Sequence, residues 1–415
     1  MTARFQAARY SGIIFIIRVN IMFSNEMYEL GAHSSVIREI FEYAKKRAEV
    51  VGRENIFDFS IGNPSVPAPE IVNETVKRLV DSVPSTELHG YTSAVGDNSV
   101  RQALAEYLNR TYSTNFRKEN FYMTAGAAAS LTITLNALYE PGDELIVLAP
   151  YFPEYRVFAE KAGMKVKVVP SDEKTLLPDF AAIESAINEH TKAIIVNSPN
   201  NPSGVVLDED CVKTLCALLE KKQREFNKNI FLISDEPYRE LVYGDVEVPY
   251  LTKYYNNTIV CYSFSKSLSL PGERIGYILV PDEVASSGDI FKAVCGAGRA
   301  LGYVCAPALF QFVIKECLGK TSDLSVYEMN RDLLVNTVTR LGFTCAKPDG
   351  AFYLFMKSPE KDAAAFCERA KKYELLFVPS DSFGFPGYVR IAYCVSTEMI
   401  RKAIPAFEKL AKEYF

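Results

Sequence analysis

Four short apolar runs, each ending abruptly in polar residues, constrain the fold of this 415-residue chain more than any other feature. They span residues 144–150, 192–199, 229–237 and 257–265. Each run is rich in β-branched and aromatic side chains and lacks the apolar–polar alternation of a half-exposed strand. Such runs are typical of parallel strands that are buried on both faces. The sequence therefore predicts a mostly parallel sheet.

Segments with helical spacing lie between these runs. Residues 208–223 carry acidic side chains in their first turn and lysines near their end, which suits the helix dipole. Residues 178–188 follow a similar pattern. Strands that alternate with helices predict an α/β fold, in which a large domain of three layers encloses the sheet.

The two ends of the chain follow a different pattern. Residues 34–51 predict one amphipathic helix, and residues 325–415 alternate helices with short strands, as in an α+β unit. We expect residues 22–62 and 304–415 to form a smaller α+β domain, and residues 63–303 to form the large domain.

The first 21 residues need a separate interpretation. Their apolar run, residues 12–17, is interrupted by Arg18 and is too short to span a bilayer. A small-residue cleavage pattern does not follow it, so a signal peptide is not indicated. We expect residues 1–21 to be an extension outside the fold, and we expect no membrane association.

Composition and charge exclude several classes of function. The net charge of −5 argues against a chain-wide basic surface for nucleic acid. The three histidines, His33, His89 and His190, lie far apart in the sequence, so neither a histidine-rich metal site nor a Ser-His-Asp hydrolase is expected. The nine cysteines form no C-x-x-C pair, which is typical of reduced thiols in a cytoplasmic protein.

Residues with functional side chains follow the predicted strands at the point where each strand ends. Phe152, Asn201 and Lys266 come just after three of the runs, and Asp235 stands where the apolar part of the run 229–237 ends. Ligands of an open parallel sheet bind beyond the carboxyl ends of its strands. We therefore expect these four side chains to lie around one pocket.

An aspartate and a lysine that face one pocket suit a particular chemistry. A lysine amine forms a Schiff base, an aldimine, with an aldehyde, and pyridoxal phosphate is an aldehyde cofactor. A carboxylate such as Asp235 favours the proton on the ring nitrogen, which lets the ring act as an electron sink. The phosphate needs a helix N-terminus, hydroxyl groups and an arginine, which residues 124–130, Ser263, Ser265 and Arg274 offer.

The cofactor ring also needs a flat partner and hydrogen-bond donors. Phe152 stands where a ring could stack, but Tyr151 directly precedes it, and the sequence leaves the choice between the two open. Asn201 and Tyr238 could donate to the ring oxygen.

Four motifs resemble those of class I and II aminotransferases, the aspartate aminotransferase-like, fold type I group of pyridoxal-phosphate enzymes. Residues 263–276 (SFSKSLSLPGERIG) are similar to the family's lysine signature, and residues 198–204 (SPNNPSG) to its N-P-x-G turn. Residues 235–238 (DEPY) are similar to its D-x-x-Y motif. Arg390 in YVRIA resembles the arginine that grips the substrate α-carboxylate. The motifs stand in the family's order from about residue 57 to the end.

The resemblance implies a role for each of these residues. Lys266, Asp235 and Tyr238 would be catalytic, with Lys266 holding the cofactor as an aldimine and moving a proton between the substrate α-carbon and the cofactor. Asp235 would pair with the ring nitrogen. The cofactor-binding residues would be Gly126, Ala127, Ala128, Phe152, Asn201, Asp235, Tyr238, Ser263, Ser265, Lys266, Arg274 and Tyr91. Gly62, Asn201 and Arg390 would bind the substrate.

The resemblance also implies partners and an activity. Tyr91 is similar to a tyrosine that reaches the phosphate of the neighbouring subunit, which implies a homodimer with composite active sites. The implied activity moves an amino group from an L-amino acid, with aspartate as the default donor, to a 2-oxo acid such as 2-oxoglutarate. Arg299 is a candidate for binding a second substrate carboxylate, for bridging subunits or for capping a helix, and the sequence does not decide between these roles.

Several other interpretations use the same residues. A β-elimination lyase or a decarboxylase would share the scaffold and Lys266. Residues 263–266 also satisfy the S-x-x-K motif of β-lactamase-like enzymes, but the accompanying K-T-G motif is absent. The glycines of residues 296–302 do not match the spacing of a dinucleotide-binding loop. A regulator domain that binds the cofactor without turnover would need a basic DNA-binding domain upstream, where one helix is expected.

Overall fold

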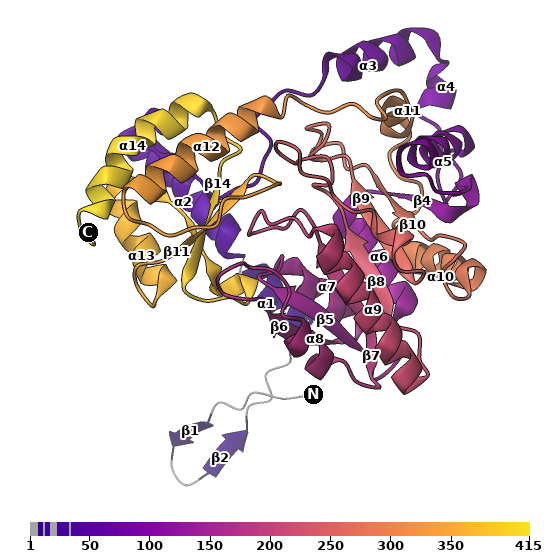
Figure 1. Ribbon diagram of the computed structural model, residues 1–415, viewed down its shortest axis with the longest axis horizontal. Helices are drawn as coiled ribbons and strands as arrows, with labels where there is room; N and C mark the ends of the chain where they lie inside the picture. The colour runs from indigo at the N-terminus through magenta and orange to yellow at the C-terminus, as the bar shows by residue number, and fades with distance from the viewer. Residues whose placement is uncertain (1–6, 11–12, 17–22, 33–34) are drawn as a thin grey trace.

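A seven-stranded sheet forms the centre of the computed structural model, which describes residues 7–10, 13–16, 23–32 and 35–415 (Figure 1). Neighbouring strands are parallel except at β10, which is antiparallel to both β4 and β9. The mostly parallel sheet is therefore confirmed. Its spatial order is β4 (Phe121–Thr124), β10 (Gly276–Leu279), β9 (Thr258–Ser263), β8 (Phe231–Asp235), β7 (Thr191–Asn197), β5 (Glu144–Ala149) and β6 (Lys165–Pro170).

The four predicted runs form β5, β7, β8 and β9, and their side chains enter two separate apolar cores. On β8, Ile233 belongs to the core on one face of the sheet and Leu232 to the core on the other face. On β9, Cys261 and Tyr262 separate in the same way. Successive side chains of a strand point to opposite faces, so a sheet covered on both faces needs apolar residues at consecutive positions.

Helices cover both faces and give the three layers that the sequence predicts. One face packs against α6 (Ala127–Leu138), α7 (Glu154–Ala162) and α10 (Ser287–Ala300). The other face packs against α5 (Asn98–Tyr112), α8 (Phe180–Ala186) and α9 (Glu209–Phe226).

A second, smaller group of elements joins the two ends of the chain. β3 (Phe57–Asp58) pairs in parallel with β12 (Leu375–Leu376). The antiparallel strands β11 (Tyr353–Lys357), β14 (Tyr388–Ala392) and β13 (Val378–Pro379) form a separate sheet. These strands pack with α2 (Val36–Val51), α12 (Ser325–Arg340), α13 (Ala363–Ala370) and α14 (Thr397–Ala411).

Helix α11 (Ala308–Glu316) packs against α5 and α3 (Glu70–Ser82), next to the short α4 (Ser85–Leu88). Residues just after 304 thus lie against helices of the predicted large domain, and the domain boundaries stay a prediction. The short 3₁₀ helices are η1 (Arg53–Asn55), η2 (Lys118–Asn120), η3 (Leu251–Lys253), η4 (Lys371–Tyr373) and η5 (Ser380–Phe383).

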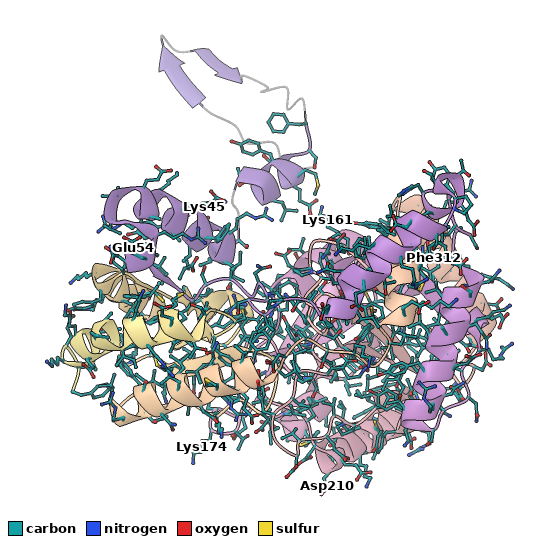
Figure 2. All side chains as sticks on the ribbon, turned by 90° about the horizontal axis from the view of Figure 1, so that it is seen from above. Lys45, Glu54, Lys161, Lys174, Asp210 and Phe312 are labelled. Atoms are coloured by element: carbon teal, nitrogen blue, oxygen red, sulfur yellow. The ribbon has the colours of Figure 1, made fainter. Side chains whose placement is uncertain are left out.

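The beginning of the chain is described in part. Strands β1 (Ala7–Tyr10) and β2 (Ile13–Ile16) form a two-stranded sheet of their own, and the rest of the predicted extension, residues 1–21, lies outside the described residues. An ion pair between Glu26 and Lys161 connects helix α1 (Asn25–Ala32) to α7. Lys161 is labelled in Figure 2. None of the helices in the described part of the chain is long and apolar enough to cross a membrane.

Gly276 of β10 packs closely against Gly126, in the loop before α6. A Cβ atom on Gly276 of β10 would lie 2.2 Å from the carbonyl oxygen of Tyr262 and 3.1 Å from the Cα of Gly126. We expect Gly276→Ala to lower the free energy of unfolding by about 1–3 kcal/mol, because backbone atoms must move apart. Gly296→Ala on α10, where nothing lies within 4 Å, should instead raise it by up to about 1 kcal/mol. Urea unfolding measures both, and equal midpoints for the two variants would contradict the close approach.

Candidate active site

A cavity of about 290 Å³ lies beyond the carboxyl ends of β7, β8 and β9. Tyr353 of β11 and Arg390 of β14, both in the smaller sheet, line it as well, as do Ile37 of α2 and Leu131 of α6. The structure brings most of the predicted site residues together here. Those that line the cavity are Gly62, Ala127, Ala128, Phe152, Asn201, Asp235, Tyr238, Ser263, Ser265, Lys266, Arg274 and Arg390.

Lys266 follows β9 and is anchored at its amine. Its Nζ donates a hydrogen bond of 2.6 Å to the carbonyl oxygen of Gly62 and lies 5.4 Å from the centre of the Phe352 ring. Burial, helped by the charges of Arg390 and Arg274, lowers the pKa of Lys266 to about 8. At pH 7 about a tenth of this amine is therefore unprotonated and able to act as a nucleophile, far more than for an ordinary lysine.

Asp235 is the last residue of β8 and keeps one carboxylate oxygen without a partner. The Tyr155 hydroxyl of α7 donates to Oδ2 at 2.5 Å, whereas Oδ1 is buried and has no hydrogen-bond partner. Burial raises the pKa of Asp235 to about 7, and the Tyr155 bond partly offsets that rise. A buried acceptor without a donor costs free energy, so Oδ1 fits a protonated ring nitrogen placed in the cavity.

Arg390 of β14 is 2% exposed, and no carboxylate pairs with it among the described residues. Its Nη1 donates to Asn201 Oδ1 at 3.1 Å and its Nη2 to the carbonyl oxygen of Ser60 at 2.5 Å, while Nε has no partner. Burial lowers the pKa of Arg390. A buried guanidinium bound only to neutral groups suits a carboxylate ligand.

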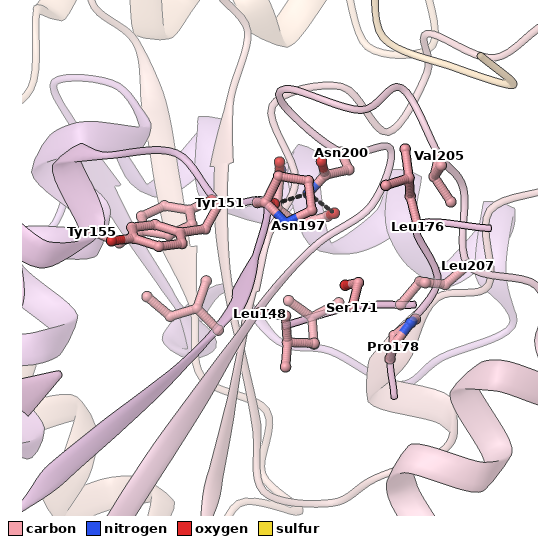
Figure 3. Close-up of a pocket in the computed structure, with 13 residues that line it drawn as sticks. Leu148, Tyr151, Tyr155, Ser171, Leu176, Pro178, Asn197, Asn200, Val205 and Leu207 are labelled. Atoms are coloured by element: carbon pink, nitrogen blue, oxygen red, sulfur yellow. Dashed lines mark hydrogen bonds between the residues drawn. The ribbon is translucent and has the colours of Figure 1, made fainter. Parts of the chain in front are cut away.

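The turn that carries Asn201 is held by its neighbour Asn200. Figure 3 shows Asn200 at the end of a smaller cavity, where its Nδ2 donates to the carbonyl oxygens of Pro150 and Asn197, each at 3.4 Å. Its Oδ1 accepts from the backbone and side chain of Ser203. These bonds close the turn on itself and so position Asn201 beside Arg390.

An anion-binding arrangement lies at the start of α6. Gly126 has φ +85°, and a Cβ atom there would lie 3.0 Å from Nη2 of Arg274. The first backbone N–H groups of a helix have no intrahelical acceptor and attract anions. Ser263 and Ser265, whose hydroxyls are 2.7 Å apart, line the same cavity as Arg274. This donor set fits a phosphate group.

Three site residues were missed by the sequence analysis. The Tyr353 and Tyr238 hydroxyls share a hydrogen bond of 2.9 Å, and Tyr155 binds Asp235. Asn197 donates to the backbone oxygen of Asp235 at 2.9 Å and accepts from the backbone N–H of Asn201 at 2.8 Å. Asn197 ends a predicted strand, so the rule that found the other residues could have found it too. Tyr353 lies in an apolar strand and Tyr155 on the buried side of the amphipathic helix α7, so neither carries a comparable signal.

The remaining residues that the sequence analysis singled out differ in whether they line the cavity. Phe152 lines the cavity, whereas Tyr151 lines the smaller cavity of Figure 3. Tyr91 is 98% exposed and does not line the cavity of its own chain. Arg299 is exposed near the end of α10, outside the cavity lining. Within the described part of the chain, no three His, Cys, Asp or Glu side chains gather in a way that could hold a metal ion.

A partly buried lysine, an unpartnered aspartate oxygen and a helix start that suits an anion face one cavity, an arrangement that fits an aldehyde cofactor with a phosphate group. Residues 54–407 match the family described as aminotransferase class I and II. The chain is 30% identical over 387 residues to an aspartate aminotransferase of Pyrococcus horikoshii. The match covers 90% of this chain and 94% of that protein. The chain therefore belongs to the class I and II aminotransferases and is a pyridoxal-phosphate-dependent transaminase.

Solved structures agree with this assignment. An aminotransferase from Eubacterium rectale is 58% identical, with a TM-score of 0.93, and the match covers 95% of this chain and 99% of that one. The aspartate aminotransferase of Thermus thermophilus with maleate is 28% identical, with a TM-score of 0.81, over 92% of this chain and 98% of that one. The predicted family and fold class are thus confirmed.

The lowered pKa of Lys266 predicts how the amine reacts with pH. Below pH 8 the reactive, unprotonated fraction grows about tenfold per pH unit, and above it the fraction is nearly complete. The rate at which the cofactor-free protein captures pyridoxal phosphate covalently should therefore rise up to about pH 8 and then level off. Stopped-flow absorbance measures it. A rate that keeps rising towards pH 10, as for an ordinary lysine, would show that burial does not perturb this amine.

Proposed function

We propose that this chain binds pyridoxal phosphate in the cavity and moves an amino group from an L-amino acid to a 2-oxo acid such as 2-oxoglutarate. One observation carries the proposal. Three ionisable groups, the buried Asp235 and Arg390 and the partly buried Lys266, face a single cavity, and among the described residues none has the oppositely charged partner that a structural role would need. When bound, the cofactor supplies an aldehyde carbon and a ring that accepts an electron pair from the substrate.

The cofactor would be held at three points. The start of α6 at residues 126–128, with Ser263, Ser265 and Arg274, would bind the phosphate. Asp235 would accept a hydrogen bond from the ring nitrogen through its free Oδ1. The remaining contacts with the ring are assigned to Phe152, which would pack on its face, and to Asn201 and Tyr238, which would bind its oxygen.

The substrate would be held at its carboxylate and deprotonated at its α-carbon. Arg390 would bind the carboxylate, and Asn201 would orient the guanidinium through the 3.1 Å bond. Gly62 would approach the carboxylate through its backbone, and its lack of a side chain leaves room for the Tyr353 hydroxyl, with which a Cβ atom there would clash. Lys266 would take the proton from the α-carbon and return it, a role that suits an amine with a pKa of about 8.

Aspartate remains the proposed default donor, as the names of the relatives suggest. The cations that line the cavity in the described chain are Lys266, Arg274 and Arg390, and each already has a proposed role. A second substrate carboxylate would therefore need a cation from another subunit, for which Arg299 is a candidate.

A homodimer would supply such a group. Tyr91, Leu301, Tyr303 and Val304 are exposed by 98%, 38%, 40% and 42%, and their loops are joined by the bond from Cys305 N to Ala94 O. We propose that this apolar surface contacts a second copy and that Tyr91 reaches the partner's phosphate site. The cytoplasmic location stays a prediction.

Product analysis distinguishes transamination from the alternatives on the same scaffold. The wild-type protein, incubated with each amino acid and 2-oxoglutarate, should form glutamate and the matching 2-oxo acid. Ammonia or carbon dioxide instead would indicate β-elimination or decarboxylation, and no product would favour a domain that binds the cofactor without turnover.

Lys266→Ala should abolish the covalent trapping of pyridoxal phosphate by borohydride, because the amine that attacks the aldehyde is lost. Peptide mass spectrometry after reduction measures it. The matched control is Lys292→Ala, at a lysine that is 80% exposed on α10, which should be trapped like the wild type. Trapping that persists in Lys266→Ala would refute the assignment.

Arg390→Ala should cut kcat/KM for amino acids by about 2–4 kcal/mol of transition-state stabilisation, because a buried charge-assisted bond to the carboxylate is removed. The kcat/KM of Arg390→Lys, which keeps the charge but not the planar guanidinium, should lie between those of Arg390→Ala and the wild type. Steady-state kinetics with an amino acid and with the corresponding amine that lacks the carboxylate measure the effect. An equal loss for both substrates would reject carboxylate recognition.

A further inference from the structure

The turn after β8 carries two sets of residues that face in opposite directions. Asp235 is bound by Tyr155 of α7, on the face of the sheet that α6 and α7 cover. Glu236, the next residue, accepts a 2.6 Å bond from Ser234 and lies near Tyr250 and Tyr277, which belong to the core of the other face. The sheet thus separates two adjacent carboxylates that are both buried.

Arg239, on the same turn, holds the second carboxylate. Its Nη1 donates to Glu236 Oε2 at 2.7 Å, and its Nε and Nη2 donate to Glu240 Oε1 at 3.3 and 3.2 Å. The Arg239 side chain is 4% exposed and that of Glu236 is 3% exposed, so solvent contributes little to the charge balance.

Tyrosine rings enclose the guanidinium of Arg239. Its central carbon lies 4.4 Å from the ring centre of Tyr262, 5.4 Å from that of Tyr112 and 5.5 Å from that of Tyr250. Tyr277 completes this set, which we call the tyrosine cage, with its hydroxyl 3.4 Å from Nη2. Cation–π contacts of this kind stabilise a desolvated cation, so the cage keeps Arg239 charged and fixed in place.

We propose that Arg239 is a positioning residue for Asp235: it neutralises Glu236 and locks the turn that presents Asp235 and Tyr238 to the cofactor. The proposal rests on the proposed function, because it needs Asp235 to hold the proton of the cofactor ring nitrogen. Arg239 itself does not line the cavity and acts only through its neighbours.

The electrostatic argument follows from the groups that face Asp235. Tyr155, Tyr238 and Cys261 are un-ionised neighbours at neutral pH, because burial raises the pKa of each. Glu236 is the nearby group whose negative charge raises the pKa of Asp235 further. Without Arg239 the two adjacent buried carboxyls, Asp235 and Glu236, would have no cation between them, so the pair would take up a proton and Asp235 would carry part of it. A neutral carboxyl no longer favours the protonated ring.

A pair of cofactors separates this role from a purely structural one. Pyridoxal phosphate carries the ring nitrogen, and its 1-deaza analogue has a carbon in the same position. The ratio of their dissociation constants, measured by equilibrium dialysis, reports how strongly Asp235 favours the ring nitrogen. We expect Arg239→Met to lower the preference for pyridoxal phosphate by about tenfold, the effect of a shift of one pKa unit.

A second variant restores the charge balance without restoring Arg239. In Glu236→Gln the source of the negative charge is gone, so the preference should equal or exceed that of the wild type. The double variant Arg239→Met with Glu236→Gln should regain the wild-type preference even if it is less stable. A preference that stays low in the double variant, or that never changes in Arg239→Met, would overturn the proposal.

A matched control exists in helix α12. Arg331 is also buried, lies 4.5 Å from the ring centre of Tyr243 and pairs with Glu328 and Asp332. Arg331→Met should lower thermal stability and leave the preference between the two cofactors unchanged. A wild-type protein that binds neither cofactor would instead refute the proposed function, which keeps the two failures distinct.

Discussion

Burial of ionisable groups without counter-charges is the constraint on which the rest of this structure depends. Asp235 and Arg390 are buried and Lys266 is partly buried, and each is held by neutral donors or acceptors of the chain. Transfer of an unpaired charge out of water is costly, so these groups need a rigid frame to keep them there. The doubly covered sheet supplies that frame.

The sheet also explains why its two faces carry different charged groups next to the site. On one side of the sheet, Asp235 has a neutral neighbour in Tyr155 and keeps a free oxygen. On the other side, Glu236 and Arg239 form a closed ion pair within the tyrosine cage. The alternation of side chains along β8 brings both arrangements to adjacent residues. One strand end therefore carries both the open carboxylate and the compensated one.

The sequence predicted the parts of this arrangement that depend on local sequence patterns. Apolar runs located β5, β7, β8 and β9, and the rule for strand ends brought Asn201, Asp235 and Lys266 to one cavity. Contacts between distant segments were beyond it. Tyr155 and Asp235 are 80 residues apart, and Tyr238 and Tyr353 are 115 apart. Neither tyrosine differs locally from a core residue, so only the tertiary fold gives it a role.

The longest connections join the two chain ends to the catalytic centre. Ser60 accepts from Arg390 across 330 residues, and Gly62 accepts from Lys266 across 204 residues. The segment that contains both lies directly after β3, which pairs with β12 near the other end of the chain. Two of the bonds that hold this segment are thus made by the side chains proposed to bind the substrate and the cofactor. A ligand carboxylate at Arg390 would compete with the Ser60 carbonyl oxygen for the guanidinium, and a Lys266 nitrogen bound covalently to an aldehyde carbon would have fewer N–H groups to donate to Gly62. Binding of the proposed ligands would therefore weaken two of the hydrogen bonds that hold this segment.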